Sequence, residues 1–127
     1  MRPEYFQTRF RTETAFDEWP YSFAIITAYA TTGEVWTEEQ NQRADERLRK
    51  VVIGIDPDAR RITGYSPTTG HAEPGWAVSM ELGAAKQIGR EFLQDAIYFV
   101  DNGSVFVAKC DGDDTPVFVD EFLNRLD

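Results

Sequence analysis

Residues 23–29, Phe-Ala-Ile-Ile-Thr-Ala-Tyr, form a run that is apolar on both alternating faces and rich in β-branched and aromatic side chains. Such a strand has to be covered on at least part of its second face, which is typical of the centre of a sheet. We therefore expect this run to be the core strand. The chain has 127 residues, of which 42% are hydrophobic, and this length is enough to bury a core without a metal or a disulfide. No linker, repeat or low-complexity segment divides it, so we expect a single domain over residues 1–127.

The clearest helix start in the sequence lies at residues 37–40, Thr-Glu-Glu-Gln. Thr37 supplies a capping hydroxyl, Gln40 stands at the reciprocal position of a capping box, and the two carboxylates between them favour the positive end of the helix dipole. We expect the helix to begin at Thr37 and to end at Asp56, because a residue before proline disfavours helical backbone. Its predicted inward face consists of Ala44, Leu48, Val51, Val52 and Ile55.

Periodicity and turn residues predict the remaining elements. Strands are expected at residues 5–11, 61–65 and 76–80, and a second helix at 82–93, in which Gly89 on the inward face indicates close packing against the sheet. Asn102-Gly103 favours a type I′ turn and predicts a hairpin of residues 96–100 and 104–108. Thr115 and Pro116 predict the start of a closing helix, with a strand at 117–119 as the alternative. The expected inward face of that helix is Phe118, Val119, Phe122, Leu123 and Leu126.

The order of these elements decides the expected fold class. Strand, helix, strand, strand, helix and strand follow one another, which matches a split βαβ, ferredoxin-like arrangement. We predict an α+β two-layer sandwich, in which two main helices cover one face of a largely antiparallel sheet. An extra hairpin strand and terminal elements complete the predicted fold.

The charge of the chain limits its partners. With 13 basic and 22 acidic residues the formal charge is −9, so nucleic acid and anionic membranes should repel the protein. No apolar run is long enough to span a membrane, and the first residues lack the apolar run of a signal peptide, which predicts a cytoplasmic location. If the negative charge serves recognition, we expect a basic protein as the partner.

The residue inventory argues against the common metal and cofactor sites. Cys110 is the only cysteine and His71 the only histidine, which excludes an internal disulfide and zinc or iron sites that need several such ligands. The acidic residues 111–114 depart from a calcium loop, because Pro116 stands where that loop needs glycine. No glycine spacing matches a phosphate-binding loop. We expect no metal and no cofactor, and a buried structural role for Cys110 in preference to a nucleophile based on His71.

Five polar or aromatic residues near the ends of predicted elements are the candidate ligand-binding residues: Thr27, Tyr29, Asn41, Glu73 and Gln94. A buried amide or hydroxyl has to be hydrogen-bonded within the protein or kept for a ligand. For Asn41, Gln94 and Thr27 we favour hydrogen bonds that satisfy backbone and cap element ends. The alternative is a polar site, at which Glu73 is the one candidate general acid or base.

Four segments of the chain carry a family resemblance: residues 23–29, Glu39-Gln40-Asn41, Glu73-Pro74-Gly75-Trp76 and residues 89–97. In this order they resemble an uncharacterised bacterial family, domain of unknown function 3293. The resemblance covers roughly Tyr21 to Lys109 and implies a small cytoplasmic protein with no established activity. Two departures stand out: residues 29–32 occupy the place of a common Asn-Pro pair, and Leu93 occupies the place of a common glycine.

The leading hypothesis from the sequence is a small acidic cytoplasmic binding or regulatory module without catalytic activity. The alternative is a small-molecule-binding protein or a cryptic enzyme, with a polar site near Thr27, Asn41, Glu73 and Gln94.

Overall fold

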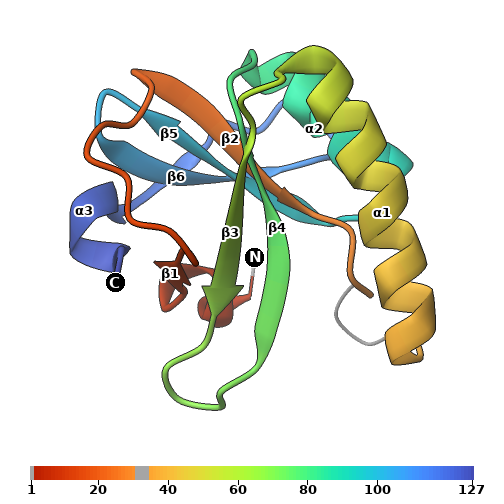
Figure 1. Ribbon diagram of the computed structural model, residues 1–127. Coiled ribbons are helices and arrows are strands. Elements are labelled where there is room, and N and C mark those ends of the chain that lie inside the picture. Colours follow the sequence, from red (N-terminus) through yellow and green to blue (C-terminus); the bar gives the residue numbers. More distant parts are fainter. Residues whose placement is uncertain (1, 31–34) are drawn as a thin grey trace.

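The computed structural model describes residues 2–30 and 35–127 (Figure 1). In this part of the chain seven strands form one antiparallel sheet in the order β1-β3-β4-β2-β5-β6-β7. The strands are β1 (Arg9–Arg11), β2 (Ser22–Thr27), β3 (Arg60–Tyr65), β4 (Ala72–Val78), β5 (Ala96–Asp101), β6 (Ser104–Lys109) and β7 (Val117–Glu121). The helices are η1 (Pro3–Phe6), α1 (Glu38–Ile55), α2 (Leu82–Glu91) and α3 (Phe122–Arg125). The predicted α+β class is therefore confirmed.

Both long helices cover the same face of the sheet, as Figure 1 shows. Ile26 of β2, Leu48 of α1 and Ile88 of α2 belong to one buried cluster, which also contains Cys110. Leu48 is fully buried because the apolar residues of α1 repeat at helical spacing on the side that meets the sheet. The two helices and this face of the sheet form the larger of the two layers of the core.

The opposite face of the sheet is covered by the N-terminal segment and α3. Phe10, Phe23 and Phe122 pack there with edge and tilted ring contacts, and the Trp19 ring stacks on Phe23 at 5.2 Å between centroids. Phe10 of β1 also forms a parallel bridge with Leu126, and the Asp127 N–H donates to the Phe10 carbonyl oxygen at 2.8 Å. The last residues of the chain thus join the β1 edge of a curled sheet.

Locally encoded elements occur where the sequence predicts them. The Thr37 side chain accepts from the Gln40 N–H while the Gln40 side chain accepts from the Thr37 N–H, which forms the expected capping box. Asn102 and Gly103 adopt φ values of 49° and 83°, as a type I′ hairpin requires. A Cβ atom on Gly89 would lie 2.4 Å from Cys110 Sγ, so the backbone of α2 does approach the sheet closely.

Two terminal predictions are wrong. Residues 5–11 are not one strand, because Pro3–Phe6 form a 3-10 helix and only Arg9–Arg11 pair with β3. The predicted closing helix is instead strand β7 followed by the four residues of α3. Pairing with the free edge of β6 overrides the helical spacing there, so the alternative of a strand is the one observed, extended to Glu121.

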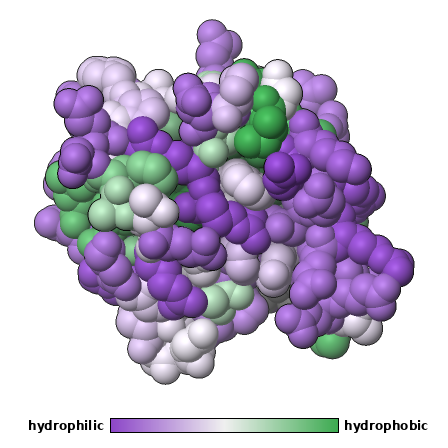
Figure 2. All heavy atoms as spheres, in the orientation of Figure 1, coloured by the Kyte–Doolittle hydropathy of each residue, from purple (hydrophilic) through white to green (hydrophobic). Residues whose placement is uncertain are grey.

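Element ends and exposure differ from prediction in smaller ways. β4 begins at Ala72 rather than at residue 76, and α2 ends at Glu91 rather than at residue 93. Four side chains predicted to face inward are exposed by 37% or more: Val51, Ile55, Phe118 and Leu123. Figure 2 shows a mostly hydrophilic face with separate hydrophobic patches, one of them on the side of α3. Within the two described ranges, no helix is long and apolar enough to cross a membrane.

Candidate functional site

A cavity of about 490 Å³ lies near the end of β2, mostly on the sheet face opposite to α1 and α2. It extends past the end of β2 to the first turn of α1 and to the residues that follow α2. Alternate residues of the sheet form its floor, among them Ile25 of β2, Gly64 of β3 and Tyr98 of β5. The N-terminal segment forms the facing wall through Tyr5 and Thr8. The cavity exists because the sheet curls and the N-terminal segment crosses this end of it.

All five candidate residues from the sequence line this one cavity: Thr27, Tyr29, Asn41, Glu73 and Gln94. Thr27 ends β2, Asn41 lies in the first turn of α1, Glu73 lies near the start of β4, and Gln94 follows α2. Antiparallel pairing of β2 with β4 and β5 places the end of one strand beside the starts of the other two.

Three of the candidates hydrogen-bond within the protein. Gln94 Nε2 donates to the carbonyl oxygens of Tyr29 at 2.8 Å and of Phe92 at 3.1 Å, and Thr27 Oγ1 donates to Gln94 Oε1 at 3.2 Å. Asn41 Oδ1 accepts from the Ala30 N–H at 2.8 Å. These contacts tie the chain that leaves β2 to both long helices. They match the structural role that the sequence favoured for the two amides.

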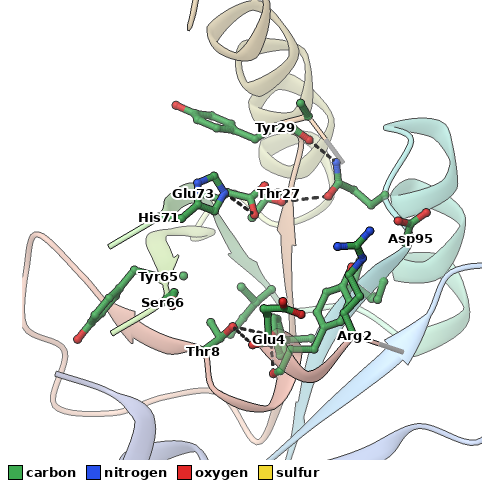
Figure 3. A pocket seen from close by; sticks show the side chains of 18 of the residues that line it. Arg2, Glu4, Thr8, Thr27, Tyr29, Tyr65, Ser66, His71, Glu73 and Asp95 are labelled. Atoms are coloured by element: carbon green, nitrogen blue, oxygen red, sulfur yellow. Dashed lines mark hydrogen bonds and ion pairs between the residues drawn. The ribbon is translucent and has the colours of Figure 1, made fainter. Parts of the chain in front are cut away.

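Glu73 differs from the other candidates because its one ion-pair partner among the described residues is a weak one. Its Oε2 atom lies 3.5 Å from His71 Nε2, and the His71 side chain is 71% exposed. Burial raises the pKa of the Glu73 carboxyl, and the neighbouring His71 opposes that shift. Thr27, Tyr29, His71 and Glu73 lie on one side of the cavity in Figure 3. Glu73 therefore presents a carboxyl group that keeps its proton to a higher pH than an ordinary glutamate does.

Other ionisable side chains surround the same space. Glu4 and Asp95 add two further carboxylates to the lining, and Arg2 adds one guanidinium. In Figure 3, Arg2, Glu4 and Thr8 stand across the cavity from Glu73. Negative charge therefore exceeds positive charge around the cavity when the three carboxyl groups are ionised.

Aromatic rings supply much of the remaining wall. The Tyr98 ring meets Phe10 edge to face at 5.2 Å between centroids, and its Oη lies 2.7 Å from the Tyr5 carbonyl oxygen and 2.9 Å from Thr8 Oγ1. Burial raises the pKa of Tyr5, Tyr29 and Tyr98 above the ordinary tyrosine value. These phenols stay protonated at neutral pH and offer hydroxyl groups next to apolar ring faces.

Comparison with known families identifies the family to which the chain is related. The model of the family described as "Protein of unknown function (DUF3293)" matches residues 26–97, more than half of the sequence. The chain belongs to this family. No curated protein and no solved structure matches it. All five candidate residues of this DUF3293 protein lie inside the matched range, whereas the N-terminal wall of the cavity lies outside it.

Leu93 of this DUF3293 protein stands where the family commonly has glycine, and it lies in a turn with unusual backbone geometry. It adopts φ 60°, in the left-handed region that favours glycine, at the place where the family resemblance leads us to expect a glycine. The turn directs Gln94 back across the end of β2, where its amide contacts Tyr29. The second departure includes Thr31 and Thr32, which lie outside the described residues.

The sequence interpretation missed several residues of the cavity. Arg2, Glu4 and Tyr5 were missed because the sequence predicts a strand at residues 5–11 and no element before it. Pro3, at the start of a helix, is the signal that could have indicated the short helix. Asp95 and Tyr98 carry no distinguishing pattern, since one follows a helix and the other alternates in a strand like any core residue. His71, considered only as a metal ligand or as a base for Cys110, lies at the cavity beside Glu73.

Cys110 lies away from this cavity, in the core beneath the long helices of the DUF3293 protein. Burial raises the pKa of its thiol to about 11, so the thiol is protonated at neutral pH. Its expected buried position is thereby confirmed. Among the residues that the structure describes, no group of three or more His, Cys, Asp and Glu side chains is placed to hold a metal ion.

Proposed function

We propose that this protein binds a small organic molecule in the cavity between the sheet and the N-terminal segment. The supporting observation is the cavity itself, about 490 Å³ in volume and lined by tyrosine rings, apolar floor residues and a few ionisable groups. Binding sites for small ligands have this size and this mixture of apolar walls with few polar groups. This proposal corresponds to the alternative hypothesis from the sequence, a small-molecule-binding protein, and it names the cavity where the ligand would bind.

The hydrogen bonds of the candidate residues favour binding without catalysis. Thr27, Asn41 and Gln94 already contact other groups of the protein, which leaves Glu73 as the candidate acid or base. The thiol of Cys110 belongs to the other layer of the core. The ligand would therefore be held chiefly by Glu73, the tyrosine rings and the apolar floor.

A fragment screen by ligand-observed NMR tests the proposed function without knowledge of the natural ligand. Amide resonances of the protein then map each hit, and we expect shifts at the end of β2 and at the starts of β4 and β5. Hits that bind only elsewhere, or a screen that returns none, would contradict a ligand site in this cavity.

The arrangement of the central elements supports a further proposal about the fold. We propose that β2, α1, β3, β4, α2 and β5 form the split βαβ, ferredoxin-like unit, extended by β1 at one edge and by β6 and β7 at the other. The strand order β3-β4-β2-β5 and the position of both helices on one face support this assignment. We also propose, from the family resemblance, that this is a cytoplasmic protein of a bacterium.

A basic protein partner is a second proposal, and exposed groups next to β7 support it. Asp111, Asp113 and Asp114 are exposed, and the exposed apolar side chains of Val117 and Phe118 follow a few residues later. A partner that presents lysine and arginine around an apolar contact would match this surface. Its association rate should fall as added salt shortens the Debye length from about 10 Å to about 3 Å. An association rate independent of salt would contradict it.

A further inference from the structure

We propose that the ligand of this cavity carries a protonated amine on a planar, largely apolar body, and that the amine pairs with Glu73. This inference rests on the proposed function, because it names the class of molecule that occupies the same cavity. Three observations carry it: the weakly paired carboxylate, the balance of charge around the cavity, and the aromatic walls.

The first observation concerns Glu73, whose side chain is 31% exposed. Within the described residues its one ion-pair partner is the His71 imidazole, with Nε2 at 3.5 Å from Glu73 Oε2. A carboxylate withdrawn from water is costly unless a cation or several hydrogen-bond donors compensate it. Other carboxylates near the sheet have closer cationic partners, as Asp45 does with Arg61 at 2.7 Å. A ligand ammonium group within hydrogen-bond distance would give Glu73 the partner that the protein itself supplies only weakly.

The second observation is the charge of the lining. Glu4, Glu73 and Asp95 face one guanidinium, that of Arg2, and the whole chain carries −9. A carboxylate or phosphate ligand would meet like charges at this wall, and repulsion between like charges across an interface is strongly unfavourable. A cation is attracted both by the wall and by the protein as a whole.

The third observation is the apolar part of the cavity. Tyr5, Tyr29 and Tyr98 line it together with Ile25 and Ala96. Tyrosine faces attract cations and stack against planar groups, while the aliphatic floor favours an apolar body. A small polar cation such as ammonium would leave this apolar surface without contact, so the geometry points to an amine that also has a ring or a comparable planar part.

Three probes that differ only in one group test this inference: tyramine, 4-ethylphenol and 3-(4-hydroxyphenyl)propionate, which are cationic, neutral and anionic at pH 7. Their dissociation constants would be measured by isothermal titration calorimetry on the full chain. We expect tyramine to bind about tenfold or more tightly than 4-ethylphenol, with the carboxylate probe weakest, as one partly desolvated charge pair implies. This comparison uses the wild-type protein and depends on no variant.

Glu73→Gln assigns the preference to one side chain. We expect this variant to lose most of the preference for tyramine over 4-ethylphenol and to keep only the weaker attraction of Glu4, Asp95 and the net charge. The matched control Glu91→Gln, at an exposed position on α2, should keep the full preference of the wild type. A tyramine preference as large in a folded Glu73→Gln variant as in the wild type would overturn the pairing with Glu73.

The outcomes separate this inference from the proposed function. Equal binding of all three probes in the cavity would overturn the amine class and leave a small-molecule site in place. Failure of all three probes to bind, while the fragment screen maps other molecules to the cavity, would also overturn the amine class alone. A fragment screen without hits in the cavity would overturn both.

Discussion

Asn41 is the residue at which the structural and ligand-binding roles separate most clearly. Its Oδ1 atom accepts from the Ala30 N–H at 2.8 Å, in a partly buried contact between the start of α1 and the chain that leaves β2. We expect Asn41→Ala to lower the free energy of unfolding by about 1 to 3 kcal/mol, because the Ala30 N–H would lose its acceptor. Denaturant unfolding measures this as a lower midpoint at unchanged slope.

Gln42→Ala is the matched control, since Gln42 is exposed and its contact with Glu38 is long, at 3.4 Å. This control should change the midpoint little. A midpoint for Asn41→Ala at or above that of the wild type would argue against the structural role and in favour of an amide kept for a ligand.

Replacing Glu73 should raise the stability of the protein, whereas replacing Asn41 should lower it, because burial raises the pKa of the Glu73 carboxyl. Between its ordinary pKa and its raised native pKa the folded protein binds more protons at this site than the unfolded chain does. The stability of the wild type therefore falls as the pH rises through that range. Glutamine cannot ionise, so we expect Glu73→Gln to be more stable than the wild type at pH 7, with a difference that disappears below the ordinary glutamate pKa.

Unfolding curves recorded across this pH range, with Glu91→Gln as the exposed control, measure the effect. Wild type that is more stable than Glu73→Gln at pH 7 would show that the carboxylate has a stabilising partner in the free protein. The expected gain in stability on removal of a binding group is the usual trade-off at ligand sites.

The candidate residues show which parts of the site could be predicted from the sequence. For Asn41 and Gln94 the sequence favoured hydrogen bonds that satisfy backbone and cap element ends. The structure contains such bonds, from the Ala30 N–H to Asn41 and from Gln94 to the carbonyl oxygens of Tyr29 and Phe92. The cavity itself could not be predicted, because its far wall comes from Tyr5 and Thr8, which are separated from Tyr98 by at least 90 positions in the sequence.

At the scale of elements, glycine-to-alanine substitutions in α2 show whether close packing or helix propensity has the larger effect on stability. A Cβ atom on Gly89 would lie 2.4 Å from Cys110 Sγ and 3.0 Å from Ile97 Cγ2. We expect Gly89→Ala to lose about 1 to 3 kcal/mol of stability through overpacking, although alanine favours a helix. Thermal or denaturant unfolding measures the loss.

Gly83 in the same helix provides the matched comparison, because nothing lies within 4 Å of a Cβ atom placed there. Gly83→Ala should stabilise the protein by about 0.5 to 1 kcal/mol. Two stabilising substitutions would show that α2 can shift away from the sheet, contrary to the close contact described.

Elements whose determinants are local were predictable, and those that depend on distant pairing were not. The capping box of α1 and the Asn102-Gly103 turn need only a few neighbouring residues, and both occur as expected. Residues 117–121 have helical spacing, yet they form a strand because β6 offers them an unpaired edge. The sequence pattern contains the strand alternative but no information on which distant edge is free.

At the scale of the whole molecule, Arg125 links the two ends of the chain. Its Nη1 donates to the carbonyl oxygens of Phe6 at 2.8 Å and Thr8 at 3.2 Å, and its Nε pairs with Asp120 at 2.9 Å. We expect Arg125→Ala to speed amide hydrogen exchange in residues 5–8 and to weaken ligand binding, because these residues form a wall of the cavity.

The control for this prediction is Arg43→Ala, which removes an exposed ion pair with Glu39 on α1. Hydrogen exchange followed by mass spectrometry compares the two variants over the same peptides. Equal protection of residues 5–8 in both would show that Arg125 is not needed to hold the N-terminal wall in place.

The same link has a consequence for the order of folding. Arg125 and Phe6 are 119 positions apart, so their contact closes a very long loop, and such contacts are slow to form. On the ribosome, the N-terminal segment emerges first but cannot take its final place until residues 117–127 have been synthesised and docked. We expect the ligand-binding cavity to be among the last parts of the molecule to mature, so nascent chains that lack these residues would carry the floor of the site without its wall.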